Sequence, residues 1–136
     1  MAVQWSTAVR DAMVGAIEGA IGTSPILEFF TGAPPATCAA ADTGTKIASG
    51  TLPSDHLAGA SGGAVARAGV WTVTGLPAAG AGTAAEHFRL KNAAGTVCHE
   101  QGTIGVGTGD MQLDNASIAN GQVATVATHT ITIGGA

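Results

Sequence analysis

The chain has 136 residues, of which only 10% are charged, and it contains 21 glycines and no tyrosine. Soluble proteins average roughly 25% charged residues, so we expect much of this weakly charged surface to be covered in a larger assembly. The net charge is −4 and the five basic residues are spread singly, which excludes a basic patch for a phosphate backbone and therefore direct binding to nucleic acid.

An apolar stripe predicts an N-terminal helix over about residues 6–21. The stripe residues recur four apart: Val9, Met13, Ile17 and Ile21. Ser6 or Thr7 can cap the start, and Gly22 is well placed to end the helix. The charged residues mark the side that we expect to face water: Arg10, Asp11 and Glu18.

Beyond Pro25 the pattern changes to short strands separated by turns, over about residues 26–134. Residues 33–45 contain Pro34-Pro35 and Gly44, which are typical of a loop. Residues 54–69 are rich in Gly and Ala and predict at most a short helical turn followed by a loop. The regular turn signals indicate one mainly β domain, residues 1–136, built as a sandwich or barrel with the N-terminal helix appended.

The stretch HFRLKNAAGTVCHEQGTIG, residues 87–105, holds two of the four histidines and one of the two cysteines. Its alternation predicts a hairpin around a tight turn at Gly95. The residues that we expect in the core are Phe88, Leu90 and Val97, together with Trp71 from an earlier strand. The residues that we expect on a solvated outer face are His87, Arg89 and Lys91. Across this hairpin, Arg89 or Lys91 can pair with Glu100.

Metal and nucleotide sites are not favoured. The possible metal ligands are Cys38, His87, Cys98 and His99. Adjacent Cys98 and His99 point to opposite faces of a strand, and the neighbouring basic residues repel a cation. The stretch GVGTGD, residues 105–110, precedes a strand pattern, whereas phosphate binding needs a helix to begin there. We therefore expect no metal and no cofactor.

A hydrolase would use Cys98 with a histidine from another strand, such as His129. The sequence carries no nucleophile motif that supports this alternative, and we predict that the chain is not an enzyme.

The cysteines Cys38 and Cys98 lie 60 positions apart. We expect no signal or transmembrane segment, because the early apolar region, residues 12–21, is interrupted by Glu18 and has no basic segment before it. This predicts synthesis in a cytoplasm and no membrane partner. In such a reducing compartment we expect two free thiols, with a disulfide as the alternative.

Two stretches resemble a family of small tailed-bacteriophage virion proteins that are encoded near the major capsid protein. They are residues 5–55 and the hairpin 87–105, and the most specific part is IGTSPILEFFTGAPPATCAAADTG, residues 21–44. The resemblance extends from Trp5 to about Ile133 and is weaker in the C-terminal strands. It implies a capsid cement (decoration) protein with a jelly-roll-like antiparallel β-sandwich. Such proteins bind the outside of an HK97-like shell, often as dimers or trimers, and clamp neighbouring capsomers.

The resemblance implies the phage major capsid protein as the partner, a homo-oligomer, and a location on the capsid exterior after synthesis in the bacterial host cytoplasm. Long loops and an aromatic residue before the helix supply the interface residues that we expect: Trp5, Pro34, Pro35, His56 and Leu57. Two alternatives stay open. One is a tail or head–tail connector component; the other is a host-surface carbohydrate-binding module, against which the scarcity of aromatic residues argues.

Overall fold

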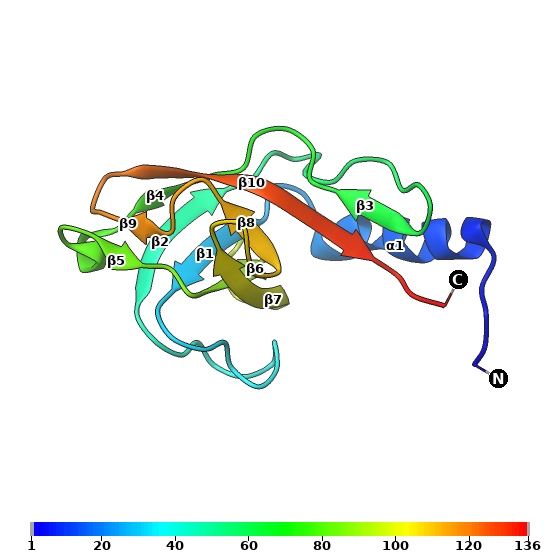
Figure 1. Ribbon diagram of the computed structural model, residues 1–136, viewed down its shortest axis with the longest axis horizontal. Coiled ribbons are helices and arrows are strands. Elements are labelled where there is room, and N and C mark those ends of the chain that lie inside the picture. The colour runs from blue at the N-terminus through cyan, green and yellow to red at the C-terminus, as the bar shows by residue number, and fades with distance from the viewer. Residues whose placement is uncertain (1, 136) are drawn as a thin grey trace.

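The computed structural model of the protein describes residues 2–135 (Figure 1). It contains the helix α1 (Thr7–Ile21) and a short 3-10 helix, η1 (Pro77–Ala79). The strands are β1 (Ile26–Phe30), β2 (Lys46–Thr51), β3 (Ala64–Ala66), β4 (Thr72–Gly75), β5 (Thr83–Ala84), β6 (His87–Lys91), β7 (Cys98–Gly105), β8 (Met111–Leu113), β9 (Ser117–Ile118) and β10 (Val123–Thr132).

Strand pairing closes one sheet into a barrel. The order is β10-β4-β2-β1-β6-β7-β8, and β8 pairs back with β10. The pairs are antiparallel except for β7 and β8, which run parallel. The prediction of a mainly β fold with one N-terminal helix is confirmed. A sandwich of two sheets is not confirmed, because the pairing forms a single barrel-like sheet; β5 and β9 pair separately.

The long strand β10 connects the barrel to an extension at one end of the molecule. Its first part pairs with β4 and β8 in the barrel, and residues 130–132 pair with β3. Helix α1 lies beside β3, and both ends of the described chain lie at this same end (Figure 1). The molecule is therefore a barrel with an extension made of α1, β3 and the end of β10.

The ends of α1 are set by local sequence, as predicted. The Ser6 side chain accepts a hydrogen bond from the Val9 N–H at 3.3 Å. Gly22 follows the last turn at a φ of 90° and donates its N–H to the Glu18 carbonyl. These contacts satisfy backbone groups that the helix ends leave without partners.

The predicted solvent side of α1 is wrong, because its charged residues face the rest of the chain. Arg10 Nη1 donates to the Gly62 carbonyl, and Asp11 accepts from the Gly63 N–H at 2.6 Å. Glu18 accepts from the Leu57 N–H at 2.9 Å. The helix packs against a loop whose backbone groups need polar partners. The charged side of the helix supplies these partners and therefore faces the loop.

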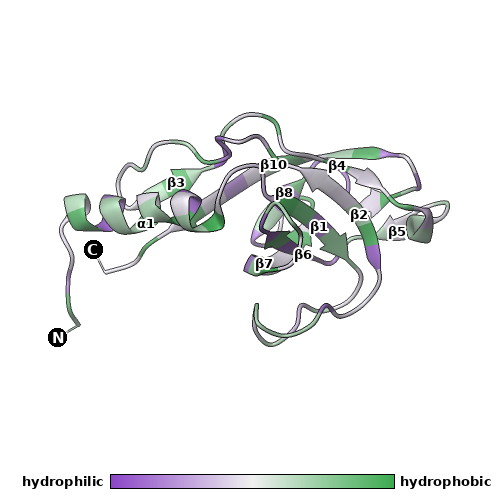
Figure 2. Cartoon of the chain, turned by 180° about the vertical axis from the view of Figure 1, so that it is seen from behind, coloured by the Kyte–Doolittle hydropathy of each residue, from purple (hydrophilic) through white to green (hydrophobic). Residues whose placement is uncertain are grey.

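The barrel core is built from the large apolar residues of its strands, and β1 is drawn mostly green in Figure 2. Trp71 is fully buried, and Phe88 and Leu90 are each 1% exposed, as predicted. Val97 is 49% exposed and does not belong to the core. Val97 lies one residue before β7 begins, in a turn that is closed by a hydrogen bond from the Asn92 N–H to the Val97 carbonyl.

Candidate functional site

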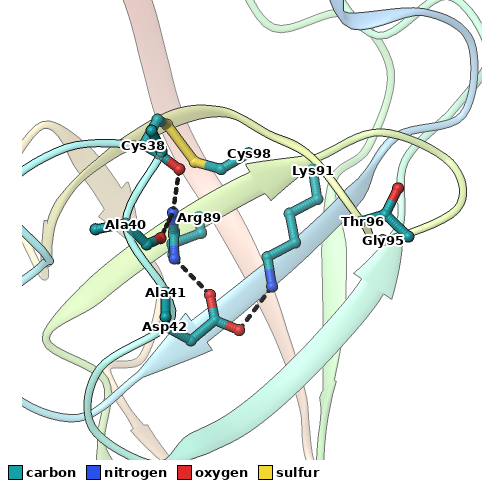
Figure 3. Close-up of a pocket in the computed structure, with 10 residues that line it drawn as sticks. Cys38, Ala40, Ala41, Asp42, Arg89, Lys91, Gly95, Thr96 and Cys98 are labelled. Atoms are coloured by element: carbon teal, nitrogen blue, oxygen red, sulfur yellow. Dashed lines mark hydrogen bonds and ion pairs between the residues drawn. A yellow bond between two sulfur atoms is a disulfide. The ribbon is translucent and has the colours of Figure 1, made fainter.

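Strand β6 is buried on both faces. The side expected to be solvated carries His87, Arg89 and Lys91, whose exposed fractions are 0%, 2% and 8%. The prediction of a solvated face is wrong because residues 32–44, which we call the strap, lie across this face. Figure 3 shows part of the strap, from Cys38 to Asp42, beside Arg89 and linked to Arg89 and Lys91. The candidate site is the set of charged groups beneath the strap.

The strap leaves the barrel and returns to it at one point. The Thr31 N–H donates to the Thr45 carbonyl at 3.1 Å, and the Thr45 N–H donates to Thr31 Oγ1 at 2.9 Å. Gly32 and Gly44 flank this stem at φ values of 75° and 72°. A Cβ on Gly44 would collide with the Thr31 carbonyl oxygen, so this position requires glycine. The strap is a compact loop with fixed ends.

Asp42 on the strap bridges two basic residues of β6. Its Oδ1 lies 2.6 Å from Arg89 Nη1 and its Oδ2 lies 2.8 Å from Lys91 Nζ. The Arg89 guanidinium also donates through Nη2 to the carbonyl oxygens of Cys38 and Ala40, at 2.6 and 3.0 Å. One buried arginine therefore binds the strap through three separate groups (Figure 3).

A second carboxylate completes the charged cluster. Glu28 of β1 is 5% exposed, and its two oxygens lie 2.9 Å from Lys46 Nζ and 2.7 Å from Lys91 Nζ. We define the ion cluster by five residues: Glu28, Asp42, Lys46, Arg89 and Lys91. Buried carboxylates are tolerated where such cations face them.

The ion cluster shifts the pKa values of Asp42 and Lys91 in the directions that favour their charged forms. Burial alone would raise the pKa of Asp42, but the hydrogen bonds and charges of Lys91 and Arg89 outweigh it and hold the pKa below its usual value. Burial alone would lower the pKa of Lys91, but Asp42 and Glu28 raise it. Both partners are therefore charged in the native state at neutral pH.

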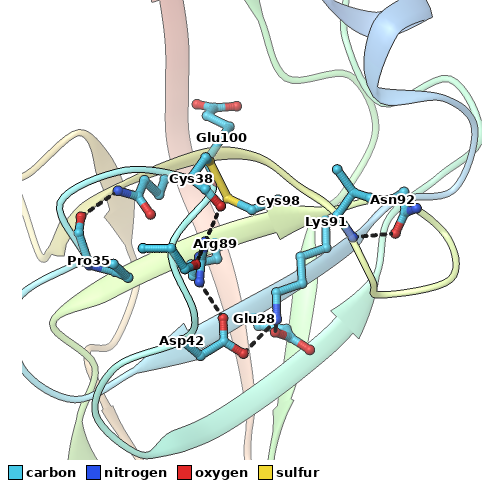
Figure 4. The surroundings of a disulfide bond; sticks show 12 residues. Glu28, Pro35, Cys38, Asp42, Arg89, Lys91, Asn92, Cys98 and Glu100 are labelled. Carbon is cyan, nitrogen blue, oxygen red and sulfur yellow. Dashed lines mark hydrogen bonds and ion pairs between the residues drawn. A yellow bond between two sulfur atoms is a disulfide. The ribbon is translucent and has the colours of Figure 1, made fainter.

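The strap is also attached covalently. Cys38 on the strap forms a disulfide with Cys98, the first residue of β7, and the two Cα atoms are 5.3 Å apart (Figure 4). The expectation of two free thiols is wrong: register places Cys98 opposite Lys91, beneath the strap. The Cys98 sulfur is bonded and is not available as the nucleophile of a hydrolase.

The expected pairing of Arg89 or Lys91 with Glu100 is also wrong. Register places Glu100 opposite Leu90, so its side chain lies on the other face of the hairpin. There it pairs with His129, whose Nε2 lies 2.7 Å from Glu100 Oε1.

His129 and His56 flank the core Trp71, with ring centroids 5.6 and 6.1 Å from it. Burial alone would lower the pKa of His129, but its contact with Glu100 outweighs this and raises the pKa. His56 is fully buried, and burial lowers its pKa despite the Glu18 carboxylate 3.5 Å from Nδ1. The surroundings therefore shift the pKa values of the two histidines in opposite directions.

The residues expected at an interface lie in three segments. Trp5 is 45% exposed before α1, and its backbone N–H donates to the Gly135 carbonyl at 2.7 Å. Pro34 is half-buried and Pro35 is buried on the strap. His56 and Leu57 are buried between the helix and the barrel, at 0% and 4% exposed. Their interface role stays a prediction, and the structure does not gather them on one surface.

The sequence reasoning missed Glu28 and Asp42, and it kept the Cys38–Cys98 disulfide only as the alternative to two free thiols. One signal was available for Glu28, because a lone acidic residue in the apolar strand ILEFF implies a cation beside it. Asp42 gave no such signal, since its loop has no periodicity.

A pocket of about 380 Å³ lies at the edge of the strap. Its lining includes Asp42, Arg89, Lys91, Thr96 and Cys98. Within residues 2–135, no group of three or more His, Cys, Asp or Glu side chains is placed to hold a metal ion. No helix in the same range is both long and apolar enough to cross a membrane.

No protein-family model, curated protein or solved structure matches this chain. None of these comparisons supports the resemblance to phage virion proteins.

Proposed function

We propose that this protein is a structural subunit of a larger assembly: a cement protein that binds the outside of a tailed-phage capsid and stabilises contacts between capsomers. The resemblance in sequence supports the identity of the assembly. One structural observation, the uncharged outer face of α1, supports a role in assembly.

The outer face of α1 carries no charged side chain. The charged residues of the helix all contact the rest of the chain, whereas Val9 and Met13 are 40% and 44% exposed. The other exposed helix residues are small: Thr7, Ala8, Ala12, Gly15, Ala16, Gly19 and Ala20. A helix on the surface of a monomer normally turns its charged side to water. The reversed orientation favours a face that is covered by a partner.

The segment before the helix extends this apolar surface. Val3 is 70% exposed and Trp5 is 45% exposed. Of the eight large hydrophobic residues exposed in the described chain, four lie within residues 3–13. This concentration fits an attachment site at the extension, and tryptophan is enriched at such sites. A cement protein is present in many copies, so even a modest contact in each copy adds to the stability of a shell.

The finer parts of the proposal are a jelly-roll sandwich, assembly as a dimer or trimer, and the major capsid protein as the partner. Each follows from the resemblance. The closed, weakly charged barrel is compatible with a structural role, and its disulfide-linked strap adds a covalent crosslink.

The test is binding to expanded capsids of the encoding phage from which this protein has been stripped. Wild-type protein should co-sediment with them and raise their thermal stability. Met13→Glu should bind at least about tenfold more weakly, because it buries a charge at the contact. Val106→Glu is the matched control, because Val106 is 58% exposed on the loop after β7.

Equal binding of both variants would exclude α1 as the attachment site. Unchanged capsid stability would exclude the cement role. Densitometry of virions separates the connector alternative, since a shell protein is present in hundreds of copies and a connector in about six or twelve.

A further inference from the structure

Arg89 and Lys91 form a binding site for a carboxylate, and Asp42 occupies it. The two basic residues alternate along β6, so their side chains share one face. Each binds a different oxygen of Asp42, at 2.6 and 2.8 Å. Among the described residues, Asp42 is the only carboxylate that pairs with Arg89, and Arg89 Nε has no partner.

All the other hydrogen-bond partners of the Arg89 guanidinium also belong to the strap. Within residues 33–44 the strap forms no strand pairing with the barrel. Besides Arg89 and Lys91, the strap is held by the disulfide at Cys38 and by Gln101 Nε2, which donates to the Pro35 carbonyl at 2.7 Å. At its first residue, the Gly32 N–H donates to Glu86 Oε2 at 2.5 Å, and His87 Nδ1 lies 2.7 Å from the Gly32 carbonyl oxygen. The disulfide is the only covalent link between the middle of the strap and the barrel (Figure 4).

We propose that Arg89 and Lys91 form a receptor for an acidic segment of another protein, closed in the oxidised chain by Asp42 and opened by reduction of the Cys38–Cys98 disulfide. Once the strap lifts, Lys91 keeps Glu28 as a partner, whereas Arg89 has no carboxylate left. The freed guanidinium then offers its donors to a carboxylate supplied by another chain. This inference does not depend on the role in a capsid.

The opening step is thiol–disulfide exchange with a dithiol reductant. One thiolate of the reductant attacks a sulfur of the Cys38–Cys98 bond and releases the other cysteine as a thiolate. The second thiol of the reductant then displaces the attacked cysteine. The protein gains two electrons and two protons as two thiols, and the reductant becomes a disulfide.

The internal occupant identifies the ligand class. The site binds a carboxylate in the closed form, and the pocket of about 380 Å³ that Arg89 and Lys91 line leaves room beside Asp42 for an acidic side chain. A nucleic acid fits less well, because the chain has a net charge of −4 and only five basic residues.

The test uses a fluorescein-labelled octaglutamate peptide and the full chain, with and without dithiothreitol. Reduction should speed amide hydrogen exchange in residues 32–44 and strengthen peptide binding, measured by fluorescence anisotropy, by about tenfold or more. The double variant Cys38→Ser/Cys98→Ser should bind like the reduced wild type without reductant. In that background, Arg89→Gln should lose binding. Arg67→Gln is the matched control, because Arg67 directly follows β3 and donates to the carbonyls of Gly69 and Ala127, away from the strap.

Equal binding by oxidised and reduced protein would overturn the proposal, as would equal losses from Arg89→Gln and Arg67→Gln. A third outcome would also overturn the proposal: an unlabelled thymidine oligonucleotide that displaces the labelled peptide at concentrations as low as unlabelled octaglutamate does. The site would then recognise phosphate. If Arg89→Gln does not fold, the comparison of oxidised and reduced wild type decides the outcome.

Discussion

Arg89 of β6 and Asp42 of the strap, 47 positions apart in the sequence, form an ion pair of 2.6 Å in which the arginine is almost fully buried. The pair holds the strap over the outer face of a barrel strand, so that this face is buried like the face that points into the core. It explains why β6 is buried at every position although it alternates between polar and apolar residues.

The disulfide should contribute measurably to stability. Replacing both Cys38 and Cys98 by serine removes a crosslink between positions 60 apart, and we expect the free energy of unfolding to fall by about 2–4 kcal/mol. Urea unfolding of wild type with and without dithiothreitol measures this loss. The double variant is the control, because dithiothreitol should leave its midpoint unchanged. An identical midpoint for oxidised and reduced wild type would contradict the prediction.

Asp42→Asn should destabilise the protein because it leaves Arg89 without a charged partner while keeping the shape of the side chain. Asp42 is itself 38% exposed, so solvent moderates the loss, and we expect about 1–2 kcal/mol. Asp55→Asn provides the control, since Asp55 is exposed and forms no ion pair within residues 2–135. Equal midpoints for Asp42→Asn and wild type in urea would show that the pair contributes nothing.

The charged form of His129 should stabilise the protein, so the free energy of unfolding should fall as pH rises. A histidine that is buried in its neutral form would have the opposite effect. The native pKa of His129 is raised above the ordinary value of 6.5 by Glu100. The contribution of His129 to the free energy of unfolding is therefore complete below pH 6.5. It is lost as pH rises through the raised native pKa. His129→Gln should abolish this loss, and NMR titration of the ring protons checks the direction. A native pKa below 6.5 would contradict the assignment.

The fold was predictable to the extent that local sequence determines it. The caps of α1 and the alternation of β6 depend on neighbouring residues, so the helix and the strand were found. What covers β6 was not predictable, since period two shows which residues share a face but not what lies on that face. Arg89, Asp42 and the two cysteines meet across 47 to 60 positions, and the pairing of β1 with β2 and β6 and of β6 with β7 brings them together.

Neighbouring positions on α1 should respond differently to substitution. Met13→Gln changes an exposed side chain, and we expect the free energy of unfolding to stay within about 0.5 kcal/mol of wild type. Val14→Ala removes buried methyl groups from a fully buried position and should cost about 2 kcal/mol. Urea unfolding of both variants checks the orientation of the helix. A larger loss for Met13→Gln than for Val14→Ala would contradict it.

The proposed role in assembly is tested most directly by a cryo-EM map of intact virions. We predict density for this barrel on the outside of the capsid, with Val9 and Met13 of α1 against the major capsid protein. A map that places the chain in the tail or connector, or that leaves the outer face of α1 exposed to solvent, would contradict the proposal.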